Sequence, residues 1–451
     1  MKFKHLLLTA SVMALFSSCS NDELVSENTS HGDAIAFSVT TNNATRAHDY
    51  WCNNNLPNNF AVSAAYCDGT NTAFYFKDDV FKKADETGNY VTNDGNYRYW
   101  PELPATTPES ISKYVNIYAY KIKDDAAATG DGFAKFEWNT ATAAPTISME
   151  PAKAAADQHD LLYAYTQVTA KPAYGAKTAI NFRHALSQIV FYAKCENKKV
   201  YVEIENIALV NAAKKGVFTL PVGTDVTNDK YIDHTQAGAA KTTGLGTWAL
   251  KYDNGSDGDS DENSKNYYAY TADCKVSNAL VALTPGAGAD AWTNLTDNKN
   301  TGTAESGTHS EHERSLLVLP QTDYSKGGTV EGKKDNSVKA YNPVPSPGTY
   351  NALSDVGGAC IAIKCKIRNI AGTEVKDNDV YLWGSKDAAE YLVVPVEFNW
   401  EQGKKYIYKI NFSKTGHGGY DPDNGKEVLV PIQLSVSVDD FAKVTDIIEN
   451  I

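Results

Sequence analysis

The chain has 451 residues, of which 42% are hydrophobic, and a formal net charge of −13 at pH 7. This length and apolar content are sufficient for packed cores and favour two domains over one. An acidic chain without a basic patch argues against binding to nucleic acid or to anionic lipid head groups.

The N-terminus has the layout of an export signal. A segment with two lysines precedes an apolar run at residues 6–16, and Ser17, Ser18 and Cys19 follow it. The run is too short to span a bilayer, which takes ~20 apolar residues, so we predict a removable signal peptide at residues 1–18. The "LFSSC" ending resembles a lipobox, in which the Cys19 thiol is diacylated and anchors the chain to a membrane. An ordinary signal peptide with an incidental cysteine is the alternative.

Residues 19–46 form a predicted lipidated propeptide that contains one strand. Ile35, Phe37 and Val39 alternate with small or polar residues, as in a strand with one face toward a core. Loss of this strand would open an apolar groove lined by unpaired backbone groups, which proteins normally do not leave exposed. The sequence therefore predicts a removable strand whose place another strand must take.

A single basic residue marks the end of this propeptide. Arg46 is the only Lys or Arg between Lys4 and Lys77, and it lies in the polar stretch "TTNNATRAHDYW". A protease specific for basic residues has one choice in such an accessible segment. We predict cleavage between Arg46 and Ala47, which would separate the strand from the mature chain.

The rest of the chain is predicted to be almost entirely β. Short runs with period-two or β-rich apolar patterns are separated by Gly, Pro, Asn and Asp, which is typical of antiparallel sandwiches. The predicted strands are 35–39, 60–66, 73–76, 115–122, 133–138, 161–168, 180–194, 200–210, 315–320, 360–367, 380–384, 391–398, 404–412 and 428–438.

The predicted domains divide the chain at Lys177, because a strong pair of strands begins directly after it. The N-terminal sandwich then covers 47–177 and the C-terminal sandwich covers 178–427. Two polar stretches, 222–265 and 286–313, are predicted to be long surface excursions of the second domain.

Residues 428–451 are predicted to form a donor-strand tail. The run alternates without a break, and too little chain follows it to build another sheet. A long alternating tail and a removable strand of the same pattern are what strand addition between subunits requires. The last strand of its own domain is the alternative for this run. The apolar positions are Val428, Val430, Ile432, Leu434, Val436 and Val438.

The sequence offers no convincing catalytic, metal or cofactor site, and we expect neither an enzyme nor a cofactor. "GGTVEGKK" departs from a phosphate-binding loop, "HSEHER" lies in a polar loop, and "DNGSDGDSDEN" lacks the calcium ligands that its spacing requires. His184 shares a strand face with Ile180 and Phe182 and is predicted to be a core or edge histidine. Cys360 and Cys365 fall on opposite strand faces and should be buried free thiols. A disulfide between Cys52 and Cys67 stays open.

Several segments in a fixed order resemble the fimbrillin family, the type V pilins of Gram-negative anaerobes. They cover most of the chain from residue 35 to 441. The segments are "NYRYWPE", "VNIYAYKI", "DLLYAYT", "INFRHALSQIVFYAK", "IENIALVNAAKKGVFTLP", "VPVEFNWEQGKKYIYKINF" and "VLVPIQLSVSVDDF".

The resemblance implies two transthyretin-like β-sandwich domains in tandem and a precursor lipidated at Cys19. It further implies cleavage at the Arg46–Ala47 bond by an arginine-specific protease and polymerisation by strand exchange. The implied partners are other pilin subunits, with the outer membrane as an anchor before cleavage and the fimbrium at the cell surface as the final location, where it supports adhesion.

A surface glycan-binding lipoprotein is the main alternative. It would account for the 27 Tyr and 7 Trp, because flat aromatic rings stack on sugars. These residues fall mostly on strand patterns, which favours a core role.

Overall fold

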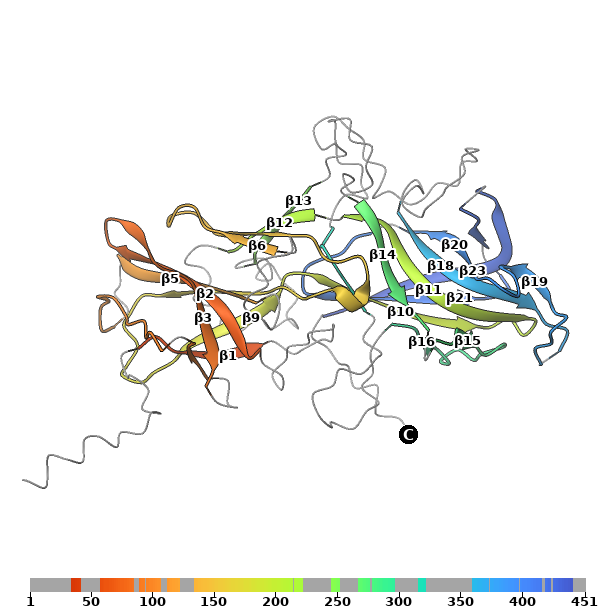
Figure 1. Ribbon diagram of the computed structural model, residues 1–451, viewed down its shortest axis with the longest axis horizontal. Helices are drawn as coiled ribbons and strands as arrows, with labels where there is room; N and C mark the ends of the chain where they lie inside the picture. The colour runs from red at the N-terminus through yellow and green to blue at the C-terminus, as the bar shows by residue number, and fades with distance from the viewer. Residues whose placement is uncertain are drawn as a thin grey trace, which may run out of the picture.

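The computed structural model shows an all-β protein whose two domains lie end to end in an elongated molecule (Figure 1). The described residues also contain one turn of 3₁₀-helix, η1 (Ala155–Asp157). No helix in this part of the chain is long and apolar enough to cross a membrane. The structure describes residues 34–41, 57–84, 89–93, 95–106, 112–121, 134–213, 215–221, 245–251, 267–275, 278–296, 315–321, 359–372, 374–396, 398–415, 418–422 and 425–440.

The first domain is built on a sheet that closes on itself. Its strands follow the order β1-β4-β3-β2-β5-β8-β9, and the sheet closes because β1 also pairs with β9. The bounds of these strands are β1 (Phe37–Thr41), β2 (Asn59–Asp68), β3 (Thr72–Lys83), β4 (Asn89–Thr92), β5 (Lys113–Lys121), β8 (Leu162–Val168) and β9 (Thr178–His184).

The second domain is a curled 12-stranded sheet with the main order β14-β11-β18-β20-β22-β23-β21-β10-β16. Strands β15, β17 and β19 pair with β11, β10 and β18, respectively. The bounds are β10 (Ser187–Cys195), β11 (Val200–Ala213), β14 (Tyr267–Asp273), β15 (Val281–Leu283), β16 (Thr293–Asn294), β17 (Leu316–Val318), β18 (Cys360–Asn369), β19 (Val380–Trp383), β20 (Glu390–Pro395), β21 (Lys404–Phe412), β22 (Gly418–Tyr420) and β23 (Glu427–Asp440).

A 4-stranded sheet, with the order β13-β12-β7-β6, packs beside the closed sheet. Its strands come from both sides of the predicted boundary at Lys177, since β12 pairs with β7. Ile147 and Phe218 from this sheet share one hydrophobic cluster with Tyr118 of β5 and Leu317 of β17. The bounds are β6 (Ala134–Glu137), β7 (Thr146–Met149), β12 (Lys215–Thr219) and β13 (Thr247–Lys251).

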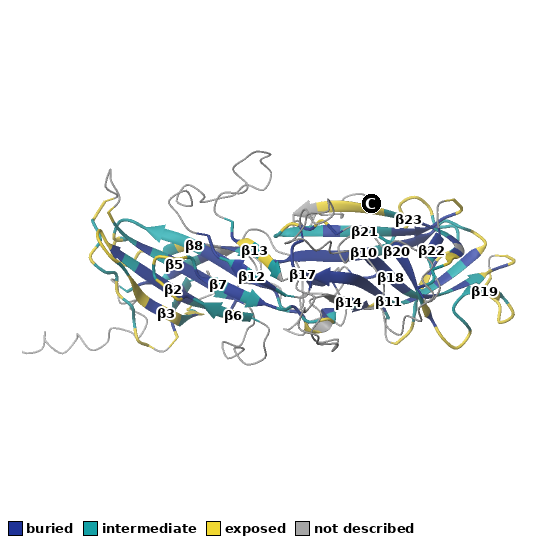
Figure 2. Ribbon diagram, turned by 90° about the horizontal axis from the view of Figure 1, so that it is seen from above, coloured by how far each residue is buried: buried dark blue, intermediate teal, exposed yellow. Residues whose placement is uncertain are grey.

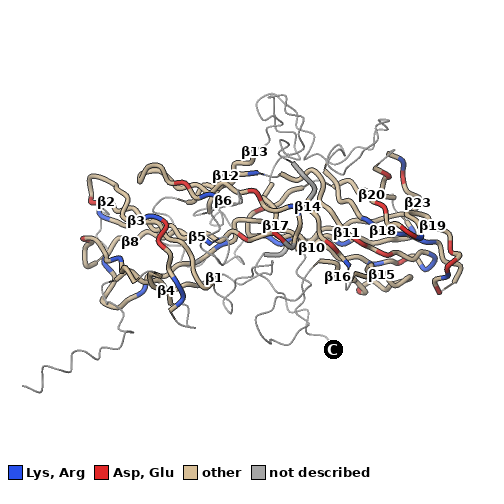
Figure 3. The backbone as a smooth tube through the Cα atoms, viewed as in Figure 1, with Lys and Arg blue, Asp and Glu red and all other residues tan. Residues whose placement is uncertain are grey.

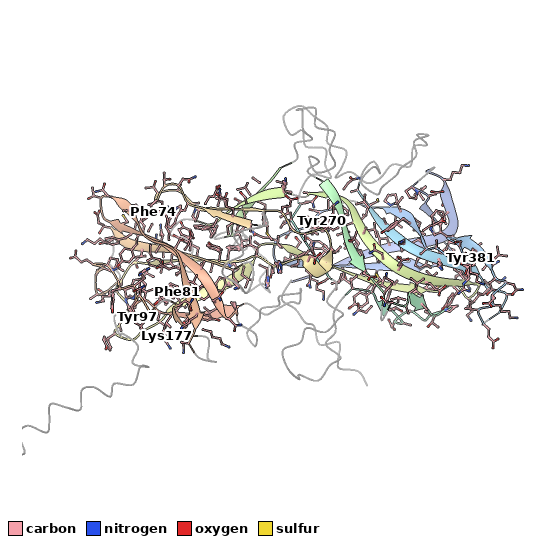
Figure 4. All side chains as sticks on the ribbon, in the orientation of Figure 1. Phe74, Phe81, Tyr97, Lys177, Tyr270 and Tyr381 are labelled. Atoms are coloured by element: carbon pink, nitrogen blue, oxygen red, sulfur yellow. The ribbon has the colours of Figure 1, made fainter. Side chains whose placement is uncertain are left out.

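Each domain has its own apolar core, and the buried residues follow the strands through both domains (Figure 2). In β21 the buried positions alternate with half-buried ones over most of the strand, as expected for a strand with one face on a core. Gly403 lies in the turn just before this strand and has a φ of 66°, a conformation that glycine adopts without steric cost. Phe81 lies in the core of the first domain, whereas Tyr381 lies at the far end of the second (Figure 4).

The all-β class is confirmed, but the prediction of purely antiparallel domains is wrong at two places. Strand β1 pairs in parallel with β9, and β10 pairs in parallel with β21. Parallel neighbours come from segments that are distant in the sequence, so no local hairpin signal indicates them. Only the three-dimensional structure brings them together.

Two other expectations differ from the observed sheets. Strand β9 belongs to the closed sheet of the first domain, although the boundary predicted at Lys177 assigned it to the second. Strand β13 lies within the stretch 222–265, which was expected to be a surface excursion, and pairs along its length with β12. The domain limits themselves stay predictions.

Basic and acidic side chains are interspersed over both domains (Figure 3). On β18, for example, Lys364 pairs with Glu205 at 2.9 Å and Arg368 pairs with Glu203 at 2.9 Å. Ion pairs that alternate in this way do not create a field of one sign. The described surface therefore mixes both signs of charge, and the expectation that the chain does not bind nucleic acid stays a prediction.

Candidate functional site

The predicted removable strand is part of the core of the first domain. Ile35, Phe37 and Val39 are 2%, 0% and 5% exposed, respectively. All three belong to the main hydrophobic cluster of the closed sheet. The intervening Ala36 and Ser38 are only half-buried. The strand therefore has the one-sided burial that its period-two pattern predicts.

Strand β1 also completes the hydrogen bonding of its neighbours. It pairs over residues 37–41 with 178–182 of β9 and at two positions with β4. Ile35 N donates to the carbonyl oxygen of Arg98 at 2.6 Å, and Thr178 N donates to that of Ala36 at 2.9 Å. Removal of β1 would leave both neighbouring strands with unpaired backbone groups, which a folded protein must satisfy by other means.

Aromatic rings form the surface on which β1 packs. The Phe37 ring lies 4.8 Å from that of Phe81 in an edge arrangement and 6.2 Å from that of Phe60. Phe60 in turn contacts Tyr90 and Phe182 at 4.8 Å and 5.1 Å between ring centroids. These contacts are of the favourable edge or tilted kind. Without β1, these rings would line an apolar groove.

Burial of the three side chains has a large energetic effect. At about 1.5 to 3 kcal/mol for each fully buried apolar side chain, the strand contributes about 5 to 9 kcal/mol as an upper bound. That is comparable to the net stability of a whole domain, about 5 to 15 kcal/mol. The empty groove would therefore strongly favour any strand that could refill it.

The predicted donor tail forms the long strand β23. It pairs with β21 over nine positions, from Lys404–Asp440 to Phe412–Ile432. In this single chain, β23 is thus a strand of its own domain. Its first half is a core element, since Val428, Val430 and Ile432 are all buried.

The second half of β23 is different. Leu434 is partly buried against the core, whereas Val436 and Val438 are 45% and 53% exposed. On the side away from β21, the partner of β23 among the described residues is β22, up to Pro431. Beyond Pro431, the described residues supply no partner for that edge. An exposed apolar face on a free strand edge is a known site for pairing with another chain.

The other predicted site residues lie outside the described residues: Cys19, Arg46 and Ala47. Strand β1 ends at Thr41, and the described chain resumes at Pro57. Arg46 thus belongs to the segment that joins β1 to the rest of the chain. Among the described residues, no group of three or more His, Cys, Asp and Glu side chains could hold a metal ion.

His184 is a buried histidine, as predicted. Its Nδ1 contacts Oδ2 of Asp160, and both side chains are almost completely buried. The pair joins the end of β9 to the segment that precedes β8. Because both polar side chains are buried and contact each other, the pair is a structural contact inside the first domain.

The described cysteines are free and buried: Cys67, Cys195, Cys274, Cys360 and Cys365. The prediction of buried free thiols is confirmed for Cys360 and Cys365, and Cys67 is free instead of bonded to Cys52. Burial raises the pKa of the Cys195 thiol to about 11 and raises the pKa of Cys360 and Cys365 still further. Such thiols stay protonated and inert at neutral pH.

The exposed aromatic residues bear on the glycan-binding alternative. Among the described residues of the first domain, the exposed rings are Phe74, Tyr75, Tyr99 and Tyr174. The Phe74 ring lies 4.9 Å from Trp138 and carries the Lys77 ammonium 3.5 Å from its centroid. The Tyr75 hydroxyl donates to the carbonyl oxygen of Tyr99. Phe74, Tyr75 and Tyr99 are therefore held by protein neighbours, which favours a structural role for these three rings.

Sequence reasoning identified β1 but missed its two partners. Strand β4 was not predicted, because its pattern "NYVT" is short and only Tyr90 and Thr92 are buried. Strand β9 overlaps the predicted strand 180–194, but its pairing with β1 was not predicted. Alternation shows which side chains face a core and carries no information about which strands lie on either side.

No protein-family model matches the chain, and the comparison with curated proteins gives no match. Solved structures do show similarity. A candidate cell adhesion protein of Bacteroides uniformis ATCC 8492 is 12% identical, with 91% of this chain and 99% of that chain covered and a TM-score of 0.35.

Two further structures come from Parabacteroides distasonis ATCC 8503. A candidate cell adhesion protein is 11% identical over 90% of this chain and 97% of that chain, with a TM-score of 0.41. A fimbrial assembly protein is 9% identical over 90% of this chain and 99% of that chain, with a TM-score of 0.32. Likeness at these identities and TM-scores establishes neither a family nor a function for this chain.

Proposed function

We propose that the protein is a structural subunit of a surface fimbrium, a pilin of the fimbrillin type that polymerises by strand exchange and supports adhesion. The observation that carries this proposal is the position of β1. A short N-terminal strand fills the core of the first domain, and the segment that joins it to the remaining chain contains an isolated arginine. On this proposal, both domains are transthyretin-like sandwiches.

The chain is exported as a lipoprotein precursor. Cys19 is acylated and holds the precursor in the outer membrane, and an arginine-specific protease then cuts after Arg46. The cut separates β1 from the mature chain, which begins at Ala47. The buried strand keeps the precursor stable and closed until that point, since it satisfies the backbone groups of β4 and β9.

After cleavage, the tail of a neighbouring subunit fills the groove. The neighbour is another copy of this chain or an accessory pilin. The apolar positions of the tail recur at every second residue from 428 to 438, as do Ile35, Phe37 and Val39. A donor strand with this period can place apolar side chains in the groove that β1 occupied.

The geometry of β23 suits a donor that swings outward. Strand β10 leaves the domain junction at Ser187, and its far end, Cys195, pairs with Phe412 of β21. Because Ile432 pairs with Phe412, β23 starts near the far end and runs back toward the first domain (Figures 1 and 2). Released from β21, its 14 residues could reach roughly 46 Å beyond that end, at about 3.3 Å per residue.

The decisive experiment is replacement of the isolated arginine. Arg46→Ala should leave a lipidated monomer in the membrane, whereas N-terminal sequencing of the wild-type surface form should begin at Ala47. Thr45→Ala keeps the arginine and serves as the matched control, with normal processing expected. Normal fibre assembly by Arg46→Ala would contradict the proposal. A mature form that stays acylated and monomeric would favour the glycan-binding lipoprotein.

A further inference from the structure

A short connection leads from β9 in the first domain into β10 in the second, with a bend at Leu186. Only Ala185 and Leu186 separate the two strands, and both are fully buried. Ala185 N donates to the carbonyl oxygen of Leu161 at 2.9 Å, and Gly403 N donates to that of Leu186 at 2.8 Å. Trp248 Nε1 donates to the carbonyl oxygen of Ala185 at 2.7 Å. The junction is therefore fixed on several sides.

At one end of this connection, β9 forms a wall of the groove that β1 occupies. At the other end, β10 pairs in parallel with β21 over eight positions, from Gln188–Lys405 to Cys195–Phe412. The inner side chains of this pair include Ile189, Phe191, Tyr408 and Ile410, all of them buried. The ladder lies toward one end of the second sheet's main strand order, between β23 on one side and the short strands β16 and β17 on the other.

The segment just before β16 contacts both strands of this pair. The Trp292 ring, just before β16, lies 4.5 Å from the Lys194 ammonium on β10 and 5.4 Å from the Lys409 ammonium on β21. Lys194 Nζ also donates to the carbonyl oxygen of Ala289 at 3.0 Å. The segment before β16 thus holds both strands through cation–π contacts, which strengthen when the groups are partly removed from water.

We propose that the β10–β21 ladder is the mechanical clamp of the subunit, the pairing through which a pulling force passes from one domain to the other. This inference rests on the proposed function, in which a neighbour's strand docks beside β9 and the subunit's own tail leaves after β21. Tension then enters β10 at Ser187 and leaves β21 at Phe412. Between these two points the ladder is the direct link.

The direction of the force makes this pairing strong. Because β10 and β21 are parallel, a pull on the start of β10 and on the end of β21 acts at opposite ends of the ladder. All the inter-strand hydrogen bonds are then loaded together, in shear. A pull on the same end of both strands would break the bonds one after another, each of them worth only ~1 kcal/mol net. Parallel pairing thus serves a mechanical need that antiparallel hairpins in the sheet do not meet.

Single-molecule pulling on the full chain tests this directly. One handle is attached at Tyr174, which is 80% exposed in the turn before β9. The second handle is attached at exposed Lys414, after β21, for shear, or at exposed Glu401, before β21, for unzipping. We expect a rupture force severalfold higher in the shear geometry. Equal forces in the two geometries would overturn the proposal.

A reversible cross-link identifies the pairing that breaks. Tyr192 and Lys409 are half-buried and directly opposite each other in the ladder, so Tyr192→Cys with Lys409→Cys should form a disulfide across it. The oxidised variant should lose the high-force peak, and reduction should restore it, which also shows that the variant folds. A peak that survives oxidation would refute the clamp.

The matched control cross-links a pair of strands outside the path. Lys364 and Tyr391 are opposite each other on β18 and β20, and Lys364→Cys with Tyr391→Cys should leave the rupture force unchanged. Loss of the peak in this control would also count against the clamp. These measurements use single chains, so a failure of polymerisation would leave their outcome intact and would contradict only the proposed function.

Discussion

Replacement of Phe37 by alanine in the uncleaved chain tests how much of the fold depends on β1. The ring is 0% exposed and packs on Phe81 and Phe60. Truncation of a fully buried phenylalanine costs about 3 to 5 kcal/mol through lost burial and the cavity that remains. We therefore expect Phe37→Ala to lower the free energy of unfolding of the precursor by that amount.

Urea unfolding followed by circular dichroism measures this difference. Ser38→Ala is the matched control, because Ser38 is half-buried on the opposite face of the same strand and its loss should change stability by less than ~0.5 kcal/mol. Cleavage after Arg46 removes residue 37, so the trimmed forms of the wild type and of Phe37→Ala should be identical in stability and in polymerisation. An uncleaved Phe37→Ala as stable as the wild type, or a difference that persists after trimming, would refute the reasoning.

Three other predictions concern the tail, the first domain and a buried thiol. Changing Val436 and Val438 to Asp should leave the melting temperature of the monomer unchanged, because both side chains are about half exposed. The same change should abolish polymers of the trimmed chain, as measured by size-exclusion chromatography. Ser437→Asp is the control and should still polymerise. Asp160→Asn should lower stability by about 1 to 3 kcal/mol in urea unfolding, because it disturbs a buried polar contact with His184. Burial raises the pKa of Cys195 from 9.0 to about 11, so its protonated form stabilises the fold fully below pH 9, and this contribution is lost as the pH rises toward 11. Iodoacetamide at pH 8 should accordingly label Cys195 only after unfolding, and rapid labelling of the folded chain would contradict its burial.

The period-two patterns located most of the long strands correctly. The run predicted at 404–412 coincides with β21, and that at 428–438 lies within β23. These segments could be identified from the sequence because alternation of apolar and polar residues is a local property of a strand with one buried face. The short strands β4 and β13 were not predicted.

The pairing of the strands could not be read in the same way. Phe37 lies next to Thr178 in the closed sheet, and nothing in either segment indicates the other. A parallel neighbour is selected by packing of the whole domain and not by a turn between the two strands. For the same reason, the sequence did not indicate that β9 pairs with β1 and β8.

The tail shows most clearly what each level determined. The sequence by itself determined that Val428 to Val438 forms one strand with one apolar face, because that follows from the alternation alone. Only the tertiary structure decided that Val430 is buried while Val436 and Val438, on the same face, are exposed. The reason is physical: alternation fixes the direction in which a side chain points, whereas burial depends on whether another element covers that place. Over the first half of β23 the core of the second domain does so, and over the second half the described chain leaves the apolar face open.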